Sequence, residues 1–132
     1  MTTGEGEVAQ DTKTVLVADD EPHLRLLVTA TLQFLPYAVI EAADGDVAWR
    51  LLLAHRPAMA LLDIRMPGRS GLELVRAIRA NPELSDMVVV LLSSKTEEAD
   101  VQAGLAAGAD RYLTKPFSPM QLLTVVEEGL ST

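Results

Sequence analysis

The 132-residue chain is predicted to form one α/β domain in which helices cover both faces of a doubly wound, five-stranded parallel sheet. Two observations predict this class. Short apolar runs suit strands that are buried on both faces, and they lie at 14–18, 37–40, 58–62, 87–92 and 111–114. Segments with an apolar period near 3.6 alternate with them, which is typical of helices with one buried face. This alternation favours right-handed crossovers between parallel strands.

The helices are expected from local start and stop signals. Pro22 suits a first helical turn, and capping-box sequences begin at Ser70 and Ser118. Asn81 before a proline ends the third helix. The apolar stripes are Leu24, Leu27, Val28 and Leu32; Val47, Leu51 and Ala54; Leu72, Val75 and Ile78; and Leu122, Val125 and Val126. The fourth helix, around 101–107, is rich in Ala and Gly and has a weaker stripe.

Composition excludes several classes of protein. The chain has no cysteine, so a disulfide framework or a thiolate metal site is excluded, and a reducing cytoplasm suits it. No apolar run reaches the roughly 18 residues that a membrane span needs. The formal charge of -8 repels nucleic acid and anionic membranes. We expect a polar, disordered leader at 1–12 without the apolar core of a secretory signal, followed by a cytoplasmic domain at 13–132.

Polar side chains stand at the carboxyl ends of the predicted strands. Asp19 and Asp20 follow the first strand, Asp63 the third, Ser93 the fourth and Lys115 the fifth. Ligands of open parallel sheets bind at these ends, so the five residues are expected to meet at one edge. Each residue alone also fits a helix cap, a turn or a solvated surface position. Their combination at one edge favours a functional site.

The chemistry of this set favours phosphoryl transfer assisted by a metal. Clustered carboxylates repel each other unless a cation joins them, and a site with only oxygen ligands favours Mg²⁺. Lys115 adds a second positive charge, and Ser93 can donate a hydrogen bond to a phosphoryl oxygen. A carboxylate such as Asp63 can accept the phosphoryl group to give an aspartyl phosphate.

These residues resemble the receiver domain of two-component response regulators over about 13–130. The resemblance is carried by the Asp19–Asp20 pair, the block Leu-Asp-Ile-Arg-Met-Pro at 62–67 with Gly71 after it, the Ser93–Ser94 step, and Tyr112 before Lys-Pro-Phe at 115–117. It implies the flavodoxin-like strand order 2-1-3-4-5 with five helices, as in chemotaxis regulators. It also implies a phosphoprotein that is no enzyme beyond its own phosphoryl transfer and dephosphorylation.

The resemblance implies partners and metal ligands. The phosphoryl donor would be a histidine kinase phosphohistidine or a phosphotransfer protein, and a protein effector would act downstream of a monomer or a phosphorylation-linked dimer. Direct contact with nucleic acid or membrane is not expected. Asp63 would accept the phosphoryl group. Asp20 and Asp63 would bind Mg²⁺ directly, Asp19 mainly through water and Arg65 through its backbone carbonyl.

The resemblance also implies a switch. Ser93 and Lys115 would contact the phosphoryl group, and the peptide bond between Lys115 and Pro116 would be cis. Ser93 would move toward the new charge and Tyr112 would swing inward, which changes the surface of the fourth helix, fifth strand and fifth helix. The alternative interpretation is that Tyr112 is an ordinary half-buried aromatic residue of the strand, with no role in switching.

Several positions depart from the commonest family pattern or need separate interpretation. Ser93 stands where threonine is frequent and keeps the hydroxyl. Arg65 and Lys95 flank the pocket, and we hypothesise that they obstruct the attacking water and lengthen the phosphoryl lifetime; the alternative is that they pair with local acids. His23 and His55 are interpreted as surface residues rather than phosphate relays.

Alternative functions stay open. A phosphatase-type hydrolase with Asp63 as nucleophile would need a second acid two residues on, where Arg65 stands. A degenerate receiver is disfavoured because every key side chain is present. The absence of a P-loop sequence disfavours a nucleotidase, and the acids after the first strand disfavour a flavin phosphate site. Both a stand-alone regulator and the receiver of a longer protein fit the sequence.

Overall fold

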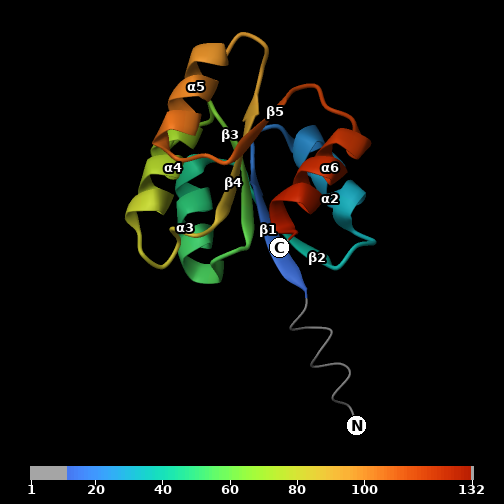
Figure 1. The fold of residues 1–132 in the computed structure, drawn as a ribbon. Helices are drawn as coiled ribbons and strands as arrows, with labels where there is room; N and C mark the ends of the chain where they lie inside the picture. Colours follow the sequence, from blue (N-terminus) through green and yellow to red (C-terminus); the bar gives the residue numbers. More distant parts are fainter. Residues whose placement is uncertain (1–11, 132) are drawn as a thin grey trace.

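The computed structural model describes residues 12–131 as a five-stranded parallel sheet between two layers of helices (Figure 1). The strands are β1 (Lys13–Ala18), β2 (Tyr37–Ala42), β3 (Met59–Asp63), β4 (Val88–Ser93) and β5 (Arg111–Thr114). The helices are α2 (Pro22–Leu32), α3 (Gly45–His55), α4 (Gly71–Ala80), α5 (Glu98–Ala107) and α6 (Pro119–Leu130). The strand order β2-β1-β3-β4-β5 confirms the predicted flavodoxin-like topology. The leader predicted at 1–12 lies outside the described residues, apart from Thr12.

Two apolar cores lie on opposite faces of the sheet. Neighbouring strand residues point to opposite faces, so Leu16 packs in the core beneath α3, α4 and α5, and Val17 packs in the core beneath α2 and α6. All residues of β3 are buried, because this strand is central and covered on both faces. The acceptor predicted at Asp63 therefore stands at the end of the most enclosed strand.

The predicted helix boundaries are confirmed at most positions. Pro22 opens α2, and α4 ends immediately before Asn81. Both predicted capping boxes form: the hydroxyls of Ser70 and Ser118 each accept a backbone N–H three residues on, and the residue at that position bonds back. An additional cap, not among those predicted, comes from Asp44, whose carboxylate accepts the Val47 N–H at 2.8 Å at the start of α3.

The predicted stripe on α3 is wrong at one position. Ala54 is exposed, whereas Ala48 and Leu52 are fully buried. The cause is a close contact at the start of the helix: the Gly45 N–H donates to the Pro67 carbonyl at 2.8 Å, and a Cβ on Gly45 would collide with the Arg69 carbonyl. This contact sets the rotation of α3 about its axis.

The start of α5 has no side-chain cap. Glu97 is the N-cap, but its side chain caps nothing; it accepts the Ser94 N–H at 2.7 Å instead. Only Val101 and Gly104 are buried on α5, which confirms its weak apolar stripe.

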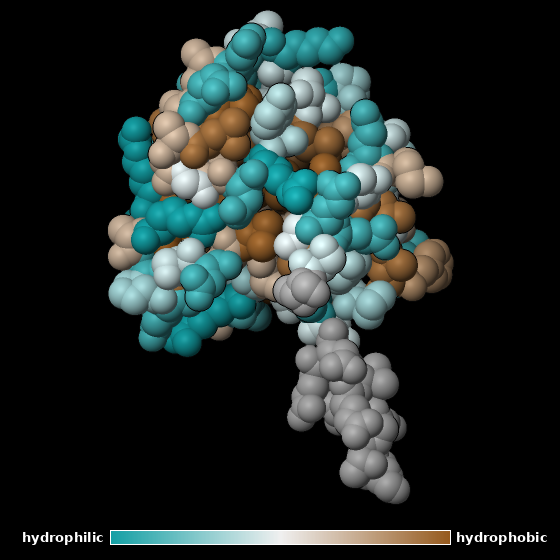
Figure 2. Space-filling view, in the orientation of Figure 1, coloured by the Kyte–Doolittle hydropathy of each residue, from teal (hydrophilic) through white to brown (hydrophobic). Residues whose placement is uncertain are grey.

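The described surface mixes hydrophilic and hydrophobic side chains, and on the face seen in Figure 2 the hydrophobic ones form separate small patches. His23 and His55 are exposed, as predicted. Within residues 12–131, no helix has the length and apolarity to cross a lipid bilayer.

Candidate functional site

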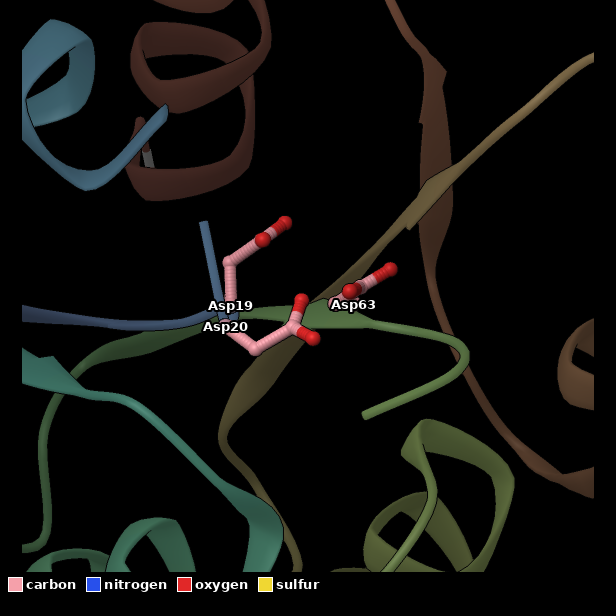
Figure 3. Close-up of side chains that lie close together, drawn as sticks. All are labelled: Asp19, Asp20 and Asp63. Atoms are coloured by element: carbon pink, nitrogen blue, oxygen red, sulfur yellow. The ribbon is translucent and has the colours of Figure 1, made fainter. Parts of the chain in front are cut away.

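Three carboxylates meet where β1 and β3 end. Asp19 and Asp20 follow β1, and Asp63 is the last residue of the neighbouring strand β3, whose Leu62 pairs with Ala18. Each carboxylate offers an oxygen within 4.8 Å of the others (Figure 3). The sequence-based expectation that strand ends bring these acids together is therefore met.

The three acids differ in burial. Asp19 is fully buried and Asp63 is 5 % exposed, whereas Asp20 is exposed. An unpaired buried carboxylate is costly, so the two buried acids need a positive partner.

Lys115 supplies that partner from beyond the end of β5. Its Nζ lies 2.8 Å from Oδ2 of Asp19 and 3.1 Å from Oδ1 of Asp63, and 3.7 Å from the exposed Glu21. The other oxygen of Asp19 accepts the Glu21 N–H at 2.9 Å. The peptide bond between Lys115 and Pro116 is cis, as predicted. One ammonium thus joins two carboxylates that belong to different strands.

Burial and neighbouring charges shift the pKa of both Asp63 and Lys115. Burial raises the pKa of Asp63 to about 6, the nearby charge of Asp19 adds to the rise, and Lys115 opposes it. Burial alone would lower the pKa of Lys115, but its hydrogen bonds to Asp19 and Asp63 outweigh burial and raise it. Lys115 is therefore charged at neutral pH, while Asp63 loses its proton within reach of physiological pH.

The donor set fits a hard divalent cation. All three groups offer carboxylate oxygen, the ligand type of Mg²⁺. Asp20 faces solvent, and among residues 12–131 the structure gives its carboxylate no hydrogen-bond or ion-pair partner. Lys115 is the one described side chain bonded to Asp63, through Oδ1. Asp20 and Asp63 therefore keep oxygens available for a metal beside the ammonium.

Ser93 and Tyr112 border a cavity next to this cluster. Ser93 ends β4 and is 1 % exposed, and its carbonyl accepts the Lys115 N–H at 2.6 Å. A cavity of about 340 Å³ lies between this strand end and α5, with Thr114, Val101 and Tyr112 in its wall. The ring of Tyr112 is half exposed.

The side chain of Arg65 pairs with acids outside the cluster of Asp19, Asp20 and Asp63. Its guanidinium lies 2.8 Å from Asp100 and 3.3 Å from Glu97 at the start of α5. The structure agrees with the alternative interpretation of Arg65, in which its side chain pairs with nearby acids. Lys95 is exposed at the rim of the cavity. Glu97 and Asp100 could not be predicted as partners of Arg65, because they lie more than 30 residues from it in the chain. The available signal was the acidic first turn of α5.

Comparisons with known proteins agree with this geometry. A model of the response regulator receiver domain matches residues 15–127. The phosphate regulon transcriptional regulatory protein PhoB of Pseudomonas aeruginosa is 37% identical over 111 residues, which are 84% of this chain and 48% of that protein. The DNA-binding response regulator MtrA of Mycolicibacterium smegmatis is 36% identical over 116 residues, 88% of this chain and 50% of that protein. The chain thus spans about half the length of these relatives.

Solved structures show the same architecture. The chemotaxis response regulator CheY4 of Vibrio cholerae superposes with a TM-score of 0.84 at 34% identity, covering 90% of this chain and 99% of that one. The receiver domain of NtrX from Brucella abortus superposes with a TM-score of 0.79 at 31% identity, covering 89% and 98%. Sequence, fold and the acidic edge of the sheet all agree: the chain belongs to the response regulator receiver domain family.

Proposed function

We propose that this domain accepts a phosphoryl group on Asp63 in a Mg²⁺-dependent reaction and transmits the change through the surface of α5, β5 and α6. The observation that supports this most strongly is the ammonium of Lys115 held between buried Asp19 and Asp63, beside the exposed carboxylate of Asp20. The acceptor carboxylate, a cation and a candidate metal ligand are thereby within reach of one incoming group.

The proposed reaction is a single displacement at phosphorus. A carboxylate oxygen of Asp63 forms a bond to phosphorus while the bond from phosphorus to the imidazole nitrogen of a phosphohistidine breaks, and the electron pair leaves with the imidazole. Bound Mg²⁺ would neutralise charge on the transferring group. Asp20 and Asp63 would hold the metal directly, Asp19 through water and Arg65 through its carbonyl. Lys115 contributes a fixed positive charge that needs no rearrangement before transfer.

The site also provides a route for transmission. Ser93, at the end of β4, would donate to a phosphoryl oxygen, and the cavity beside it would give Tyr112 room to move inward. Added phosphoryl charge of about -1.5 to -2 would favour the inward arrangement. Two packings of one surface, with populations set by phosphorylation, account for signalling without turnover of a substrate.

Partners follow from the same chemistry. A histidine kinase or a phosphotransfer protein would supply the phosphoryl group, and a protein effector or an attached domain would respond, with the receiver as a monomer or a phosphorylation-linked dimer. One relative is named as DNA-binding, but this chain spans only half of it. The net charge of -8 supports a receiver that does not itself touch nucleic acid.

Incubation with Mg²⁺ and acetyl phosphate tests the proposal. Intact-mass spectrometry is expected to show one added phosphoryl group that hydroxylamine removes. Asp63→Asn should take up none, whereas Asp86→Asn, which removes an exposed aspartate elsewhere, should be labelled as the wild type is. Repeated turnover of unrelated phosphoesters would instead identify a phosphatase. Absence of label on the wild type would identify a degenerate receiver.

A further inference from the structure

Two arginines attach α5 to the rest of its layer, one at each end of the helix. α4 and α5 lie side by side on the same face of the sheet (Figure 1). Arg79 of α4 contacts the carboxyl-terminal end of α5, and Arg65 from the loop after Asp63 contacts the amino-terminal end. The two attachments differ greatly in burial and in number of bonds.

The carboxyl-terminal attachment is extensive. Arg79 donates to the Gly108 carbonyl at 2.9 Å, to the carbonyls of Ser85 and Met87 at 3.0 and 2.7 Å, and to Asp110 at 2.9 Å. The same oxygen of Asp110 accepts the N–H of the β4 residue at position 89. Arg79 is only 22% exposed, so water competes poorly for its bonds to the three carbonyls. This end of α5 is fixed to α4 and to the sheet.

The amino-terminal attachment is slight. The Arg65 side chain is 73% exposed, so water competes for its guanidinium, although its partners Glu97 and Asp100 are only 11% and 34% exposed. The side chain of Glu97 caps no backbone group of α5. The cavity of about 340 Å³ lies beneath this half of the helix, with Val101 in its wall. Few contacts oppose movement of this end.

We propose that Arg65 is the residue through which a phosphoryl group on Asp63 releases the amino-terminal end of α5. Arg65 follows the acceptor by two residues, and in this structure Glu97 and Asp100 share its guanidinium. A phosphoryl group offers charge-assisted, bidentate bonds that are stronger than exposed carboxylate pairs. The guanidinium therefore transfers to the phosphoryl oxygens, and both acids of α5 lose their partner. This inference rests on the proposed function of Asp63.

The consequence is a pivot rather than a shift of the whole helix. The end held by Arg79 stays in place, and the end that loses Arg65 moves over the cavity beside Ser93. Tyr112 borders the same cavity, so movement of α5 and of this ring would be coupled.

Hydrogen–deuterium exchange of the full chain tests the pivot, with and without Mg²⁺ and acetyl phosphate. Without donor, Asp100→Asn and Arg65→Gln should speed exchange over 98–103 by about two- to fivefold, the range expected when an exposed ion pair is lost. The control Glu83→Gln removes another exposed ion pair, with Arg56 at 2.9 Å, and should leave exchange over α5 unchanged. With Mg²⁺ and acetyl phosphate, exchange of the wild type should speed up by the same factor over 98–103 and should not change over 104–109.

These measurements distinguish failure of the Arg65 inference from failure of the proposed phosphorylation of Asp63. Arg65→Gln should show no further change on phosphorylation, which a purely structural role for Arg65 would not produce. Equal exchange over 98–103 in wild type and Asp100→Asn without donor overturns the inference. The inference is also overturned if the wild type is phosphorylated and its exchange over 98–103 does not change. If intact mass shows no label on the wild type, the proposed function fails instead, and the comparison without donor still tests the attachment of α5.

Discussion

The ammonium of Lys115 lies 3.1 Å from Oδ1 of Asp63, although 52 residues separate them in the chain. The same ammonium is 2.8 Å from Asp19, so one positive charge serves two buried carboxylates. The metal-free site therefore holds an excess of negative charge, and its ionisation and stability should depend on pH and on divalent cations.

We expect Asp63→Asn to stabilise the metal-free protein at pH 7.5. Burial raises the pKa of Asp63 from 3.8 to about 6, so the folded protein holds this proton more tightly than the unfolded chain does. The resulting stabilisation is fully present below about pH 4 and is lost as the pH rises through 6. Replacing the acid avoids a loss of up to about 3 kcal/mol. Urea unfolding in EDTA should show that the free energy of unfolding of Asp63→Asn exceeds that of the wild type at pH 7.5, and that this difference is smaller at pH 4.5. The control Asp86→Asn should show no gain in stability at either pH.

Mg²⁺ should stabilise the wild-type protein against urea. A ligand that binds only the folded state at about 100 times its Kd adds about 2.7 kcal/mol. Asp20→Ala should abolish this gain, because Asp20 is the exposed carboxylate that has no described protein partner. Without metal the variant should be no less stable than the wild type, since a repelling charge is gone. Equal Mg²⁺ stabilisation of both proteins would contradict a role for Asp20 in binding.

Lys115→Ala should destabilise the protein by about 3 kcal/mol at pH 7.5, because breaking a buried ion pair leaves uncompensated charge. Both Asp19 and Asp63 lose their partner, so the effect should shrink at acid pH as carboxylates gain protons. Urea unfolding at two pH values measures this. Lys95→Ala, at an exposed position, serves as the control and should change little. A pH-independent loss would mean that Lys115 acts by packing alone.

The double variant Arg65→Ala, Lys95→Ala should lose its phosphoryl group several-fold faster than the wild type. The physical reason is that two long cations no longer obstruct the attacking water. Decay of the label after removal of acetyl phosphate measures the rate. Unchanged decay would refute the hypothesis that these side chains extend the phosphoryl lifetime.

Arg79→Ala should destabilise the domain by about 3 kcal/mol, since charged hydrogen bonds to half-buried carbonyls contribute about 1.5–3 kcal/mol each and are not additive. Arg76→Ala removes an exposed arginine from the same helix and should cost far less. Urea unfolding of the two variants compares them. Similar losses would show that the bonds of Arg79 to Gly108 and Asp110 contribute no more than a surface charge does.

Much of this architecture was predictable because strand ends and helix starts are local signals. The strict alternation of apolar runs and helical stripes predicts the sheet, and the position of Asp63 and Lys115 after their strands predicts the shared edge. Contacts between distant side chains were not predictable. Nothing near Arg65 in sequence selects Asp100 as its partner, and the rotation of α3 depends on how closely Gly45 approaches a loop that comes later in the chain.

The close approach of Gly45 to the Arg69 carbonyl has a mechanical consequence. The bond from the Gly45 N–H to the Pro67 carbonyl holds the segment after the acceptor against α3, and the bond from the Gly71 N–H to the Ile64 carbonyl closes that segment on itself. On the side of α5 the same segment is held through the exposed side chain of Arg65. A disturbance that begins at Asp63 would therefore be directed toward α5 rather than toward α3.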